Sequence, residues 1–490
     1  MKTINLLKYQ VAVAIIILLA SCEDFLDKTS KTDHWGDAVT IVPTESKYAT
    51  PEEAVAELNG AYNGFRNDVY QFELFFYNDA QSDNCYEGGD GVPEAEVENL
   101  KVNSLNSKTE MMWEQLYAMA GNATSVIENT RMMKPGAIDE TERTRIMAEG
   151  KFIRSWVYFD IIRIWGDAPF NIKLLPAVTA GAIDTIYHLY YPSRTPIDKI
   201  YDGIIRDLED AIPSLSGRSQ GYRFGSKGAA YGLLAKIYAT KGEKSGRNYQ
   251  KVVDYCNLVI AEGYSLMNSY EELWDPYSNN ETRESIFEVD YTLNRGNWAF
   301  WVLFSEEDGS ITWRRYCTPT HEVISKYTTD DRRFNSTITY KTVPYDTYFP
   351  SNNYPIANKI RTKEANIILM RLADIILLKA EALVELGNVS EAIELVNNIR
   401  NRAGLDNIAN NMSKEEARLV VENERQLELM LEGHRWFDLN RNDRMIEVMT
   451  KHRGKNGQIL FPTISEHRKL WPIPQNEKDQ NPNLTQNQGY

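Results

Sequence analysis

The sequence predicts a mostly α-helical protein, in which tetratricopeptide-like helix pairs carry a loop-rich ligand-binding subregion. Three observations support this class. Apolar and small residues recur every three to four positions over most of the chain, as one buried helix face requires. Two helix–glycine–helix segments share one pattern of small and apolar residues. Strand signals are confined to short pieces such as 285–289 and 337–340.

The first expected helix covers residues 49–66. Thr50 suits its N-cap, and Pro51, Glu52 and Glu53 suit its first turn. Similar patterns predict further helices at about 109–131, 139–165, 195–214, 226–242, 247–262, 366–386, 389–403 and 413–447. The segments 67–108 and 263–365 are irregular and rich in polar and aromatic residues. Long irregular segments inside a helical protein are usually functional loops.

Two helix pairs resemble each other. Residues 235–242 match residues 380–387 in a small-x-apolar-apolar-x-x-x-Gly pattern, and a second amphipathic helix follows each of them. Helix, glycine turn and helix, with small residues where the helices cross, is the arrangement of tetratricopeptide repeats. The pairs are far apart in the sequence, so we expect an interrupted array.

The N-terminus has the pattern of an export signal. The ten apolar residues 11–20 follow Lys2 and Lys8 and are too few to span a bilayer, which needs about 20. Residues 19–22 (Leu-Ala-Ser-Cys) resemble a bacterial lipobox, which implies that Cys22 is acylated and becomes the mature N-terminus. Two acyl chains give stable membrane anchoring. The alternative is an ordinary cleaved signal followed by an incidental cysteine. We expect a signal peptide over 1–21 and one domain over 22–490, working outside the cytoplasm.

Composition excludes several classes of function. The formal net charge is −15, and removal of residues 1–21, which hold two lysines and no acids, makes it −17. This charge disfavours nucleic acid or an anionic lipid surface as the main partner. After Cys22 only Cys85, Cys256 and Cys317 remain, which form neither a disulfide framework nor a zinc motif. The six histidines show no metal-ligand spacing, so no cofactor or metal is expected.

Aromatic density gives the best indication of a ligand site. The window 291–316 holds seven aromatic residues in 26, where the chain average of 11% predicts about three, and it also contains Asn and Arg. Aromatic faces pack against the C–H faces of sugars, and amides and guanidinium groups bond hydroxyls. A second cluster, 70–77, leads into a polar and aromatic loop. The expected ligand contacts are Trp298, Trp301, Trp313, Tyr291, Asn294, Arg314, Tyr86, Asp83 and Asn84. The alternative is that these aromatic residues are core, which we expect for the phenylalanines of both clusters.

Two charged stretches each allow a structural and a functional interpretation. The acids between Glu87 and Glu98 could supply oxygens to a structural calcium, but they lack EF-hand spacing, so we expect a solvated loop. The charges from Glu428 to Arg441 are spaced three and four residues apart, which predicts pairing on one helix face rather than an acid–base catalytic pair.

Four regions resemble the SusD/RagB family of outer-membrane lipoproteins. They are Cys22–Asp27 (C-E-D-F-L-D), residues 149–169 (E-G-K-F-I-R-S-W-V-Y-F-D to W-G-D-A-P), residues 424–439 (E-R-x-x-E-L-x-x-E-G-H-R-W-F-D-L), and the final L-W-P-I-P-Q … N-P-x-L-T-Q-N-x-G-Y. Gly150 and Ser155 stand where alanine is commoner in the family. The tail motif predicts a C-terminus pinned against the helical body.

The resemblance implies a surface lipoprotein of the outer membrane that is not an enzyme. Such a protein binds a nutrient, here a glycan or oligosaccharide, and delivers it to a TonB-dependent, SusC-like β-barrel transporter. It implies no fixed ligand contacts, because the binding loops vary. Three alternatives stay open: a RagB-like peptide-binding lipoprotein, a surface glycan hydrolase with two placed carboxylates, and a structural repeat scaffold.

Overall fold

The computed structural model describes residues 43, 45–178, 183–218, 221–275, 280–292, 294–306 and 308–490. The chain divides into two compact units. One contains Met1–Pro43 and Leu175–Tyr190, and its described part includes helix α6 (Ile183–Tyr190). The other contains Thr44–Leu174 and Tyr191–Tyr490 and holds every other named element. The predicted signal peptide and Cys22 lie outside the described residues.

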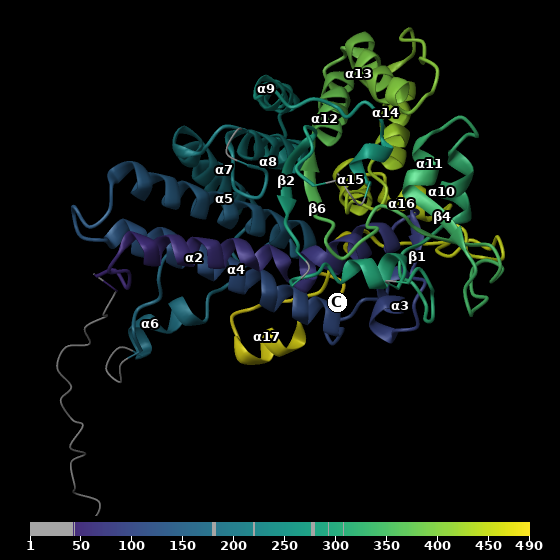
Figure 1. Cartoon of the computed structure of the whole chain (residues 1–490). Coiled ribbons are helices and arrows are strands. Elements are labelled where there is room, and N and C mark those ends of the chain that lie inside the picture. Colours follow the sequence, from purple (N-terminus) through teal and green to yellow (C-terminus); the bar gives the residue numbers. More distant parts are fainter. Residues whose placement is uncertain are drawn as a thin grey trace, which may run out of the picture. The chain divides into compact units, whose positions relative to one another are not determined.

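Four helices pack side by side at the start of the larger unit (Figure 1). They are α2 (Pro51–Asn63), α4 (Ser107–Met132), α5 (Glu140–Trp165) and α7 (Ile197–Ala211). The predicted cap is confirmed, since the Thr50 hydroxyl accepts the Glu53 N–H at 3.3 Å. Gly150 of α5 faces α4 so closely that a Cβ there would lie 2.8 Å from Ile127. This glycine therefore sets the close approach of α4 and α5.

The two predicted helix pairs form one stack. α8 (Lys227–Thr240) pairs with α9 (Tyr249–Ala261), and α12 (Leu372–Glu385) pairs with α13 (Val389–Arg402). α12 also packs on α8 and α9, and α14 (Lys414–Glu428) packs on α12 and α13 (Figure 1). The tetratricopeptide-like fold class is thus confirmed. The long segment between α9 and α12 is an insertion into a continuous helix stack.

Three short antiparallel strand pairs organise the irregular segments. β2 (Ser285–Val289) pairs with β6 (Ile367–Arg371), and β4 (Ile338–Lys341) pairs with β5 (Tyr354–Ala357). β1 (Cys85–Tyr86) pairs with β3 (Thr318–Pro319), which joins the two predicted loop regions. Short helices described in the same segments are α3 (Val92–Glu98), α10 (His321–Lys326) and α11 (Arg333–Thr337), with the short π-helices η2 (Val69–Glu73), η3 (Phe76–Ala80) and η8 (Phe300–Phe304) and the 3-10 turn η7 (Glu271–Leu273).

Two helix predictions were wrong in part. The helix expected over 366–386 begins only at Leu372, because the preceding residues form β6 and pair with β2. The helix expected over 413–447 ends at Glu428, since Leu431 and Gly433 have φ of +61° and +76° in the left-handed region. The chain resumes as α15 (Arg435–Arg441) and α16 (Met445–Met449).

The charges after α14 therefore do not share one helix face. Asp438 does pair with Arg441, at 2.7 Å, as the spacing predicted. Glu428 instead pairs with Arg371 at 2.6 Å and with Arg402, and Glu432 pairs with Lys359 at 2.6 Å. These side chains are buried. They form a buried ion network between α14, β6 and the insertion, in which losing one partner would leave a charge uncompensated.

The C-terminal segment is pinned as predicted. The indole of Trp471 is buried and donates to Gln81 Oε1 at 2.8 Å. The Asn487 amide donates to the carbonyl oxygens of Trp165 at 3.0 Å and Trp471 at 2.7 Å. Between them lies α17 (Gln475–Gln480). The tail is thereby fixed to the end of α5.

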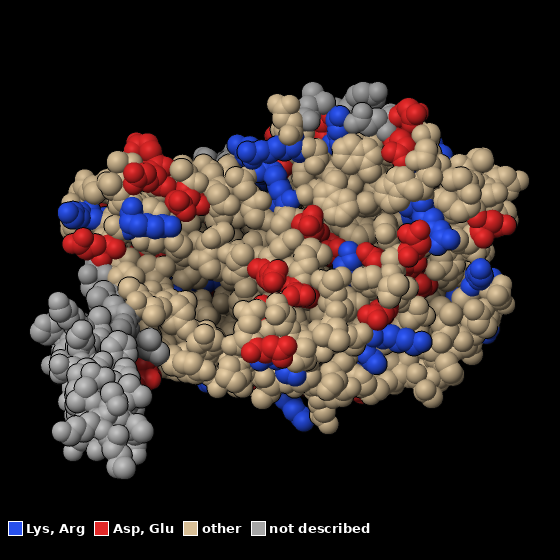
Figure 2. All heavy atoms as spheres, turned by 90° about the horizontal axis from the view of Figure 1, so that it is seen from below, with Lys and Arg blue, Asp and Glu red and all other residues tan. Residues whose placement is uncertain are grey.

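The surface carries mixed charge. Figure 2 shows the side on which α17 lies, where acidic and basic residues are interspersed among a majority of uncharged ones. Among the described residues, no helix combines the length and apolar character that crossing a membrane requires.

Candidate functional site

The two aromatic clusters of the sequence meet in the structure. Trp298 donates its backbone N–H to Gln71 Oε1 at 3.0 Å and its indole N–H to Asp68 Oδ1 at 3.2 Å. Its ring centroid lies 5.3 Å from that of Phe72, and Phe72 lies 5.2 Å from Tyr316. The segments 68–77 and 291–316 therefore form one aromatic assembly, in which Phe72 is the buried link.

Trp313 is the exposed end of this assembly. It is 39% exposed, and every other tryptophan among the described residues is less exposed. Its ring lies 6.4 Å from that of Tyr316, and the Arg315 guanidinium lies 4.3 Å from its centroid. Arg315 is 1% exposed and donates to Glu306 Oε1 at 2.8 Å and to the Trp313 carbonyl at 3.0 Å. A buried cation thus holds an exposed indole in place.

A glycine turn packs beside the same rings. A Cβ on Gly89 would lie 2.1 Å from Cε1 of Tyr316, so only glycine allows this approach. Arg314 donates to the Gly89 carbonyl at 2.9 Å, which brings its guanidinium to the edge of the assembly. The Val302 carbonyl accepts the Tyr316 N–H at 2.9 Å, which ties η8 to this segment.

We call Trp298, Trp301, Trp313 and Tyr316 the aromatic platform. Each of these four side chains is partly exposed, Trp313 most of all. Flat aromatic faces bind the apolar faces of a ligand, and the donors of Arg314 at the edge suit hydroxyl or carbonyl oxygens. Asn294, at the start of the same loop, is also exposed. The platform can therefore hold a ligand that is flat and apolar on its faces and polar at its rim.

Asp83 and Asn84 lie in the interior instead. Asp83 accepts two hydrogen bonds from Arg435, at 2.7 and 2.9 Å, and this cation holds the pKa of Asp83 well below its usual range, against the effect of burial. Asn84 donates to Asp79 Oδ1 at 2.8 Å and accepts from Gln426 at 2.8 Å. Both side chains are engaged by structural partners, so we propose no ligand contact for them.

Tyr86 and Tyr291 are likewise buried. The ring of Tyr86 stacks on Tyr348 at 4.4 Å, its hydroxyl donates to the Arg453 carbonyl at 3.1 Å, and burial raises its pKa to about 12. These two tyrosines position the loops and do not line the platform. Sequence reasoning had not selected Tyr316 and Arg315, although both lie within the aromatic window.

A group of buried carboxyls lies close to the platform. Glu87 is 5% exposed, and its Oε1 has no hydrogen-bond partner. Burial, with the charges of Glu98 and Glu94 nearby, raises its pKa to about 8, while Arg314 acts in the opposite direction. Burial also raises the pKa of Glu98 to about 7. Lys108 pairs with Glu94 at 2.8 Å. Among the described residues, no three or more His, Cys, Asp or Glu side chains are grouped as metal ligands.

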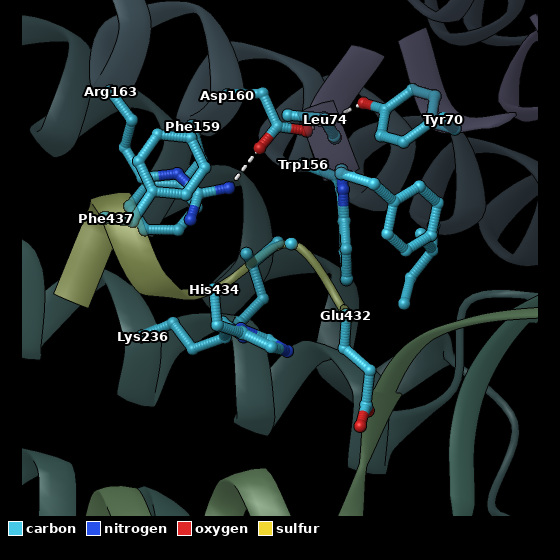
Figure 3. A pocket seen from close by; sticks show the side chains of 14 residues that line it. Tyr70, Leu74, Trp156, Phe159, Asp160, Arg163, Lys236, Glu432, His434 and Phe437 are labelled. Atoms are coloured by element: carbon cyan, nitrogen blue, oxygen red, sulfur yellow. Dashed lines mark hydrogen bonds and ion pairs between the residues drawn. The ribbon is translucent and has the colours of Figure 1, made fainter. Parts of the chain in front are cut away.

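A small internal cavity lies where α5, α8 and the segment after α14 meet (Figure 3). Its volume of about 40 Å³ has room for one or two waters. Figure 3 shows Asp160 accepting from the Tyr70 hydroxyl, at 2.8 Å, and pairing with Arg163. Burial and the nearby Lys236 lower the pKa of His434 to about 3. The cavity holds charged groups but is too small for a sugar or a peptide.

Comparisons with known proteins cover nearly the whole chain. A family described as "SusD family" matches residues 261–490, and one described as "Starch-binding associating with outer membrane" matches residues 24–239. A SusD-like protein P2 of Formosa agariphila is 26% identical over 99% of this chain and 100% of its own length. A SusD-like protein of Bacteroides ovatus is 24% identical over 88% of this chain and 82% of its own.

Solved structures share the fold. A SusD superfamily protein from Parabacteroides distasonis has a TM-score of 0.75 and 25% identity, and the match covers 91% of this chain and 100% of that one. A laminarin-binding SusD-like protein has a TM-score of 0.73 and 24% identity over 90% and 100%. Surface glycan-binding protein A from Bacteroides thetaiotaomicron, in complex with laminarihexaose, has a TM-score of 0.74 and 20% identity over 89% and 99%.

Proposed function

The chain belongs to the SusD/RagB family, and from this premise we propose that it captures an extracellular glycan or oligosaccharide at the outer membrane. In this proposal it delivers the ligand to a TonB-dependent, SusC-like β-barrel transporter. The observation that carries the proposal is the aromatic platform with its exposed Trp313. The family description "Starch-binding associating with outer membrane" supports both the ligand class and the location.

The proposed ligand contacts are Trp298, Trp301, Trp313, Tyr316, Arg314 and Asn294. Trp313 stacks on a sugar ring, because its face is exposed and Arg315 fixes its orientation. Arg314 bonds the hydroxyls at the rim. Trp298 is half-buried and its indole N–H is bound to Asp68, so less of its ring is free for a ligand than that of Trp313.

Anchoring is proposed to occur through acylated Cys22, which keeps the domain at the membrane that holds the transporter. We also propose that the protein performs no covalent chemistry on its ligand. The carboxylates of the small cavity and of the buried ion network are engaged by arginine or lysine, which suits a structural role. A glycosidase needs two carboxyls about 5–9.5 Å apart beside a substrate-sized cleft.

The test is calorimetric titration of the purified protein and of its Trp313→Ala variant with a panel of neutral oligosaccharides that includes laminarihexaose. Leu386→Ala is the control, because Leu386 is similarly exposed (41%) but lies at the end of α12. Loss of an aromatic anchor costs about 2 kcal/mol, or roughly thirtyfold in affinity. The proposal predicts this loss for Trp313→Ala alone, at an unchanged melting temperature.

A short-peptide panel is titrated in parallel. If the protein binds peptides but not glycans, and Trp313→Ala loses this binding, the ligand of the platform is a peptide and not a glycan. Release of shortened glycans by the purified protein would instead favour the hydrolase alternative. Unchanged glycan binding by Trp313→Ala would remove the platform from the proposal.

A further inference from the structure

A groove of about 940 Å³ lies apart from the aromatic platform. Its wall combines the turn after α5, the helix α15 and the C-terminal segment from Ser465 to Gly489. These are segments that carry the family-like motifs of the sequence, and the platform residues are not among its lining. Its volume is in the range of about 300–1,000 Å³ that small-ligand pockets occupy.

The groove has a basic lining in an acidic protein. Four of its lining residues are Lys or Arg and two are Asp or Glu, whereas the whole chain has a net charge of −15. The basic residues are Arg163, Arg194, Arg441 and Lys469, and the acidic residues are Asp167 and Glu466. His467 also lines the groove; burial lowers its pKa below the ordinary value, so it adds no charge at neutral pH. Among the lining residues alone, basic side chains thus outnumber acidic ones by two.

Two of these cations are already neutralised inside the protein. Arg441 pairs with Glu381 and with Asp438, and Arg163 pairs with Asp160 between two phenylalanine rings. Their guanidinium groups are mostly buried. Their charges are therefore offset by these carboxylates, and we propose no ligand contact for either.

Arg194 differs from both. It donates to the carbonyl oxygens of Asp167 at 2.7 Å, Trp165 at 3.2 Å and Thr485 at 3.2 Å, and to the side-chain oxygen of Asn487. Among the described residues, no carboxylate lies within ion-pair distance of Arg194. The Oδ1 of Asp167 accepts a hydrogen bond from the N–H of Ile197 instead. Burial lowers the pKa of Arg194, which stays charged at any physiological pH. A half-buried cation without a carboxylate partner lines an open groove.

Lys469 is the second accessible cation. It pairs with Asp443 at 3.0 Å and Glu466 at 2.7 Å, and the side chains of these acids are 77% and 67% exposed. Ion pairs of this exposed kind are weak, typically 0–1 kcal/mol. The Lys469 ammonium can therefore exchange such a partner for a ligand.

We propose that this groove binds a small ligand with a carboxylate group, which is held by Arg194 and Lys469. Two sources share this chemistry: an acidic sugar of the uronate type and the C-terminal end of a short peptide. The site is independent of the aromatic platform, whose ligand needs no charge. The protein would thus take up an acidic ligand at a second place.

The test is calorimetric titration of the purified protein with a galacturonic acid disaccharide, its neutral galactose counterpart, and diglycine. We expect binding of an acidic probe but not of the neutral disaccharide, with weaker binding as salt is raised. Lys469→Met should weaken binding about tenfold or more, as loss of a charge-assisted hydrogen bond implies. Lys455→Met is the control, because Lys455 is exposed and outside the groove.

The three probes distinguish the possible ligands. Tighter binding of the disaccharide than of diglycine assigns the groove to acidic sugars, and the reverse order assigns it to peptide ends. Arg194→Gln should also weaken binding of the acidic probe. Because Arg194 holds the C-terminal segment, the melting temperature of this variant must be compared with that of the wild type. If Arg194→Gln is unstable, Lys469→Met alone tests the proposal. Trp313→Ala should leave acid binding unchanged, which keeps this result distinct from failure of the glycan proposal. Equal binding of acidic and neutral disaccharides, binding of neither acid, or unchanged affinity in Lys469→Met would overturn the proposal.

Discussion

We expect Glu87, close to the aromatic platform, to make the stability of this protein depend on pH. Burial raises the pKa of this carboxyl from 4.5 to about 8. In the unfolded chain the group ionises near 4.5, so folding is penalised wherever the unfolded state is charged. Glu87 therefore lowers the free energy of unfolding as pH rises. The loss is absent below pH 4.5, grows as pH rises toward 8, and is complete above 8.

The magnitude follows from the size of the shift. Each pKa unit corresponds to 1.36 kcal/mol, and after an allowance for partial solvation of the carboxyl the full penalty is about 3 kcal/mol. Glu87→Gln removes the charge and keeps the shape. We therefore expect Glu87→Gln to raise the free energy of unfolding by about 3 kcal/mol at pH 9 and by little at pH 4.5. Urea unfolding at the two pH values measures both quantities.

Asp90→Asn provides the matched control, because Asp90 lies three residues away on the same loop and is exposed. It should change stability by less than about 0.5 kcal/mol at either pH. Equal stability of wild type and Glu87→Gln at pH 9 would refute the reasoning. Equal stabilisation by Asp90→Asn would instead show that the effect is one of overall charge.

Four further predictions concern the buried ion network, a buried carboxylate at low pH, the half-buried Trp298 and the lipid anchor at Cys22. Arg371→Met removes the cation that Glu428 and Glu432 share and should lower the free energy of unfolding by about 3 kcal/mol in urea titrations, although Arg402 and Lys359 remain; a loss smaller than about 1 kcal/mol would show the shared cation to be dispensable. Arg435 holds the pKa of Asp83 below its usual range, against the effect of burial, so the stability that ionised Asp83 contributes at pH 6 should be lost as pH falls below about 4; thermal melts should show the difference between wild type and Asp83→Asn shrinking from pH 6 to pH 3, and an unchanged difference would contradict this. Trp298→Ala should melt earlier than Trp313→Ala, because Trp298 packs on Phe72 and bonds Asp68; the reverse order in thermal melts would assign Trp298 to the surface. Cys22→Ala should release a folded protein from the membrane fraction and abolish labelling by a palmitate analogue, whereas equal labelling of the variant would remove the lipid anchor.

Local signals in the sequence predict local structure well. The cap at Thr50 and the helical period place α2 and α5 within a few residues of their observed bounds. The errors occur where distant partners decide. Residues 367–371 look helical by themselves but pair with β2, some eighty residues earlier in the chain. The break after Glu428 is imposed by the left-handed Leu431, which no apolar period reveals.

The same limit explains the candidate site. Aromatic density identifies the loop that carries Trp313, because an excess of indoles in an irregular segment is a local property. It cannot separate Trp313 from Tyr86, whose ring is covered by Tyr348. Asp83 resembles a ligand contact in sequence because its partner Arg435 lies 352 residues away. A polar residue beside aromatics becomes a site or an anchor according to contacts that only the fold supplies.

The platform is built from inserted loops, yet it is rigidly supported. β3, directly after the platform residues, pairs with β1. Asn297 is buried and donates to the Ala365 carbonyl at 3.2 Å, and Arg315 donates to the carbonyl oxygens of Phe304 at 2.9 Å and Trp313 at 3.0 Å. Few side chains would therefore lose rotamer freedom when a ligand binds. Each side chain that is immobilised costs about 0.5–1.5 kcal/mol of binding free energy. A helix stack that tolerates a long insertion between α9 and α12 can thus change its ligand by changing the loop, while the stack and the pinned tail stay the same.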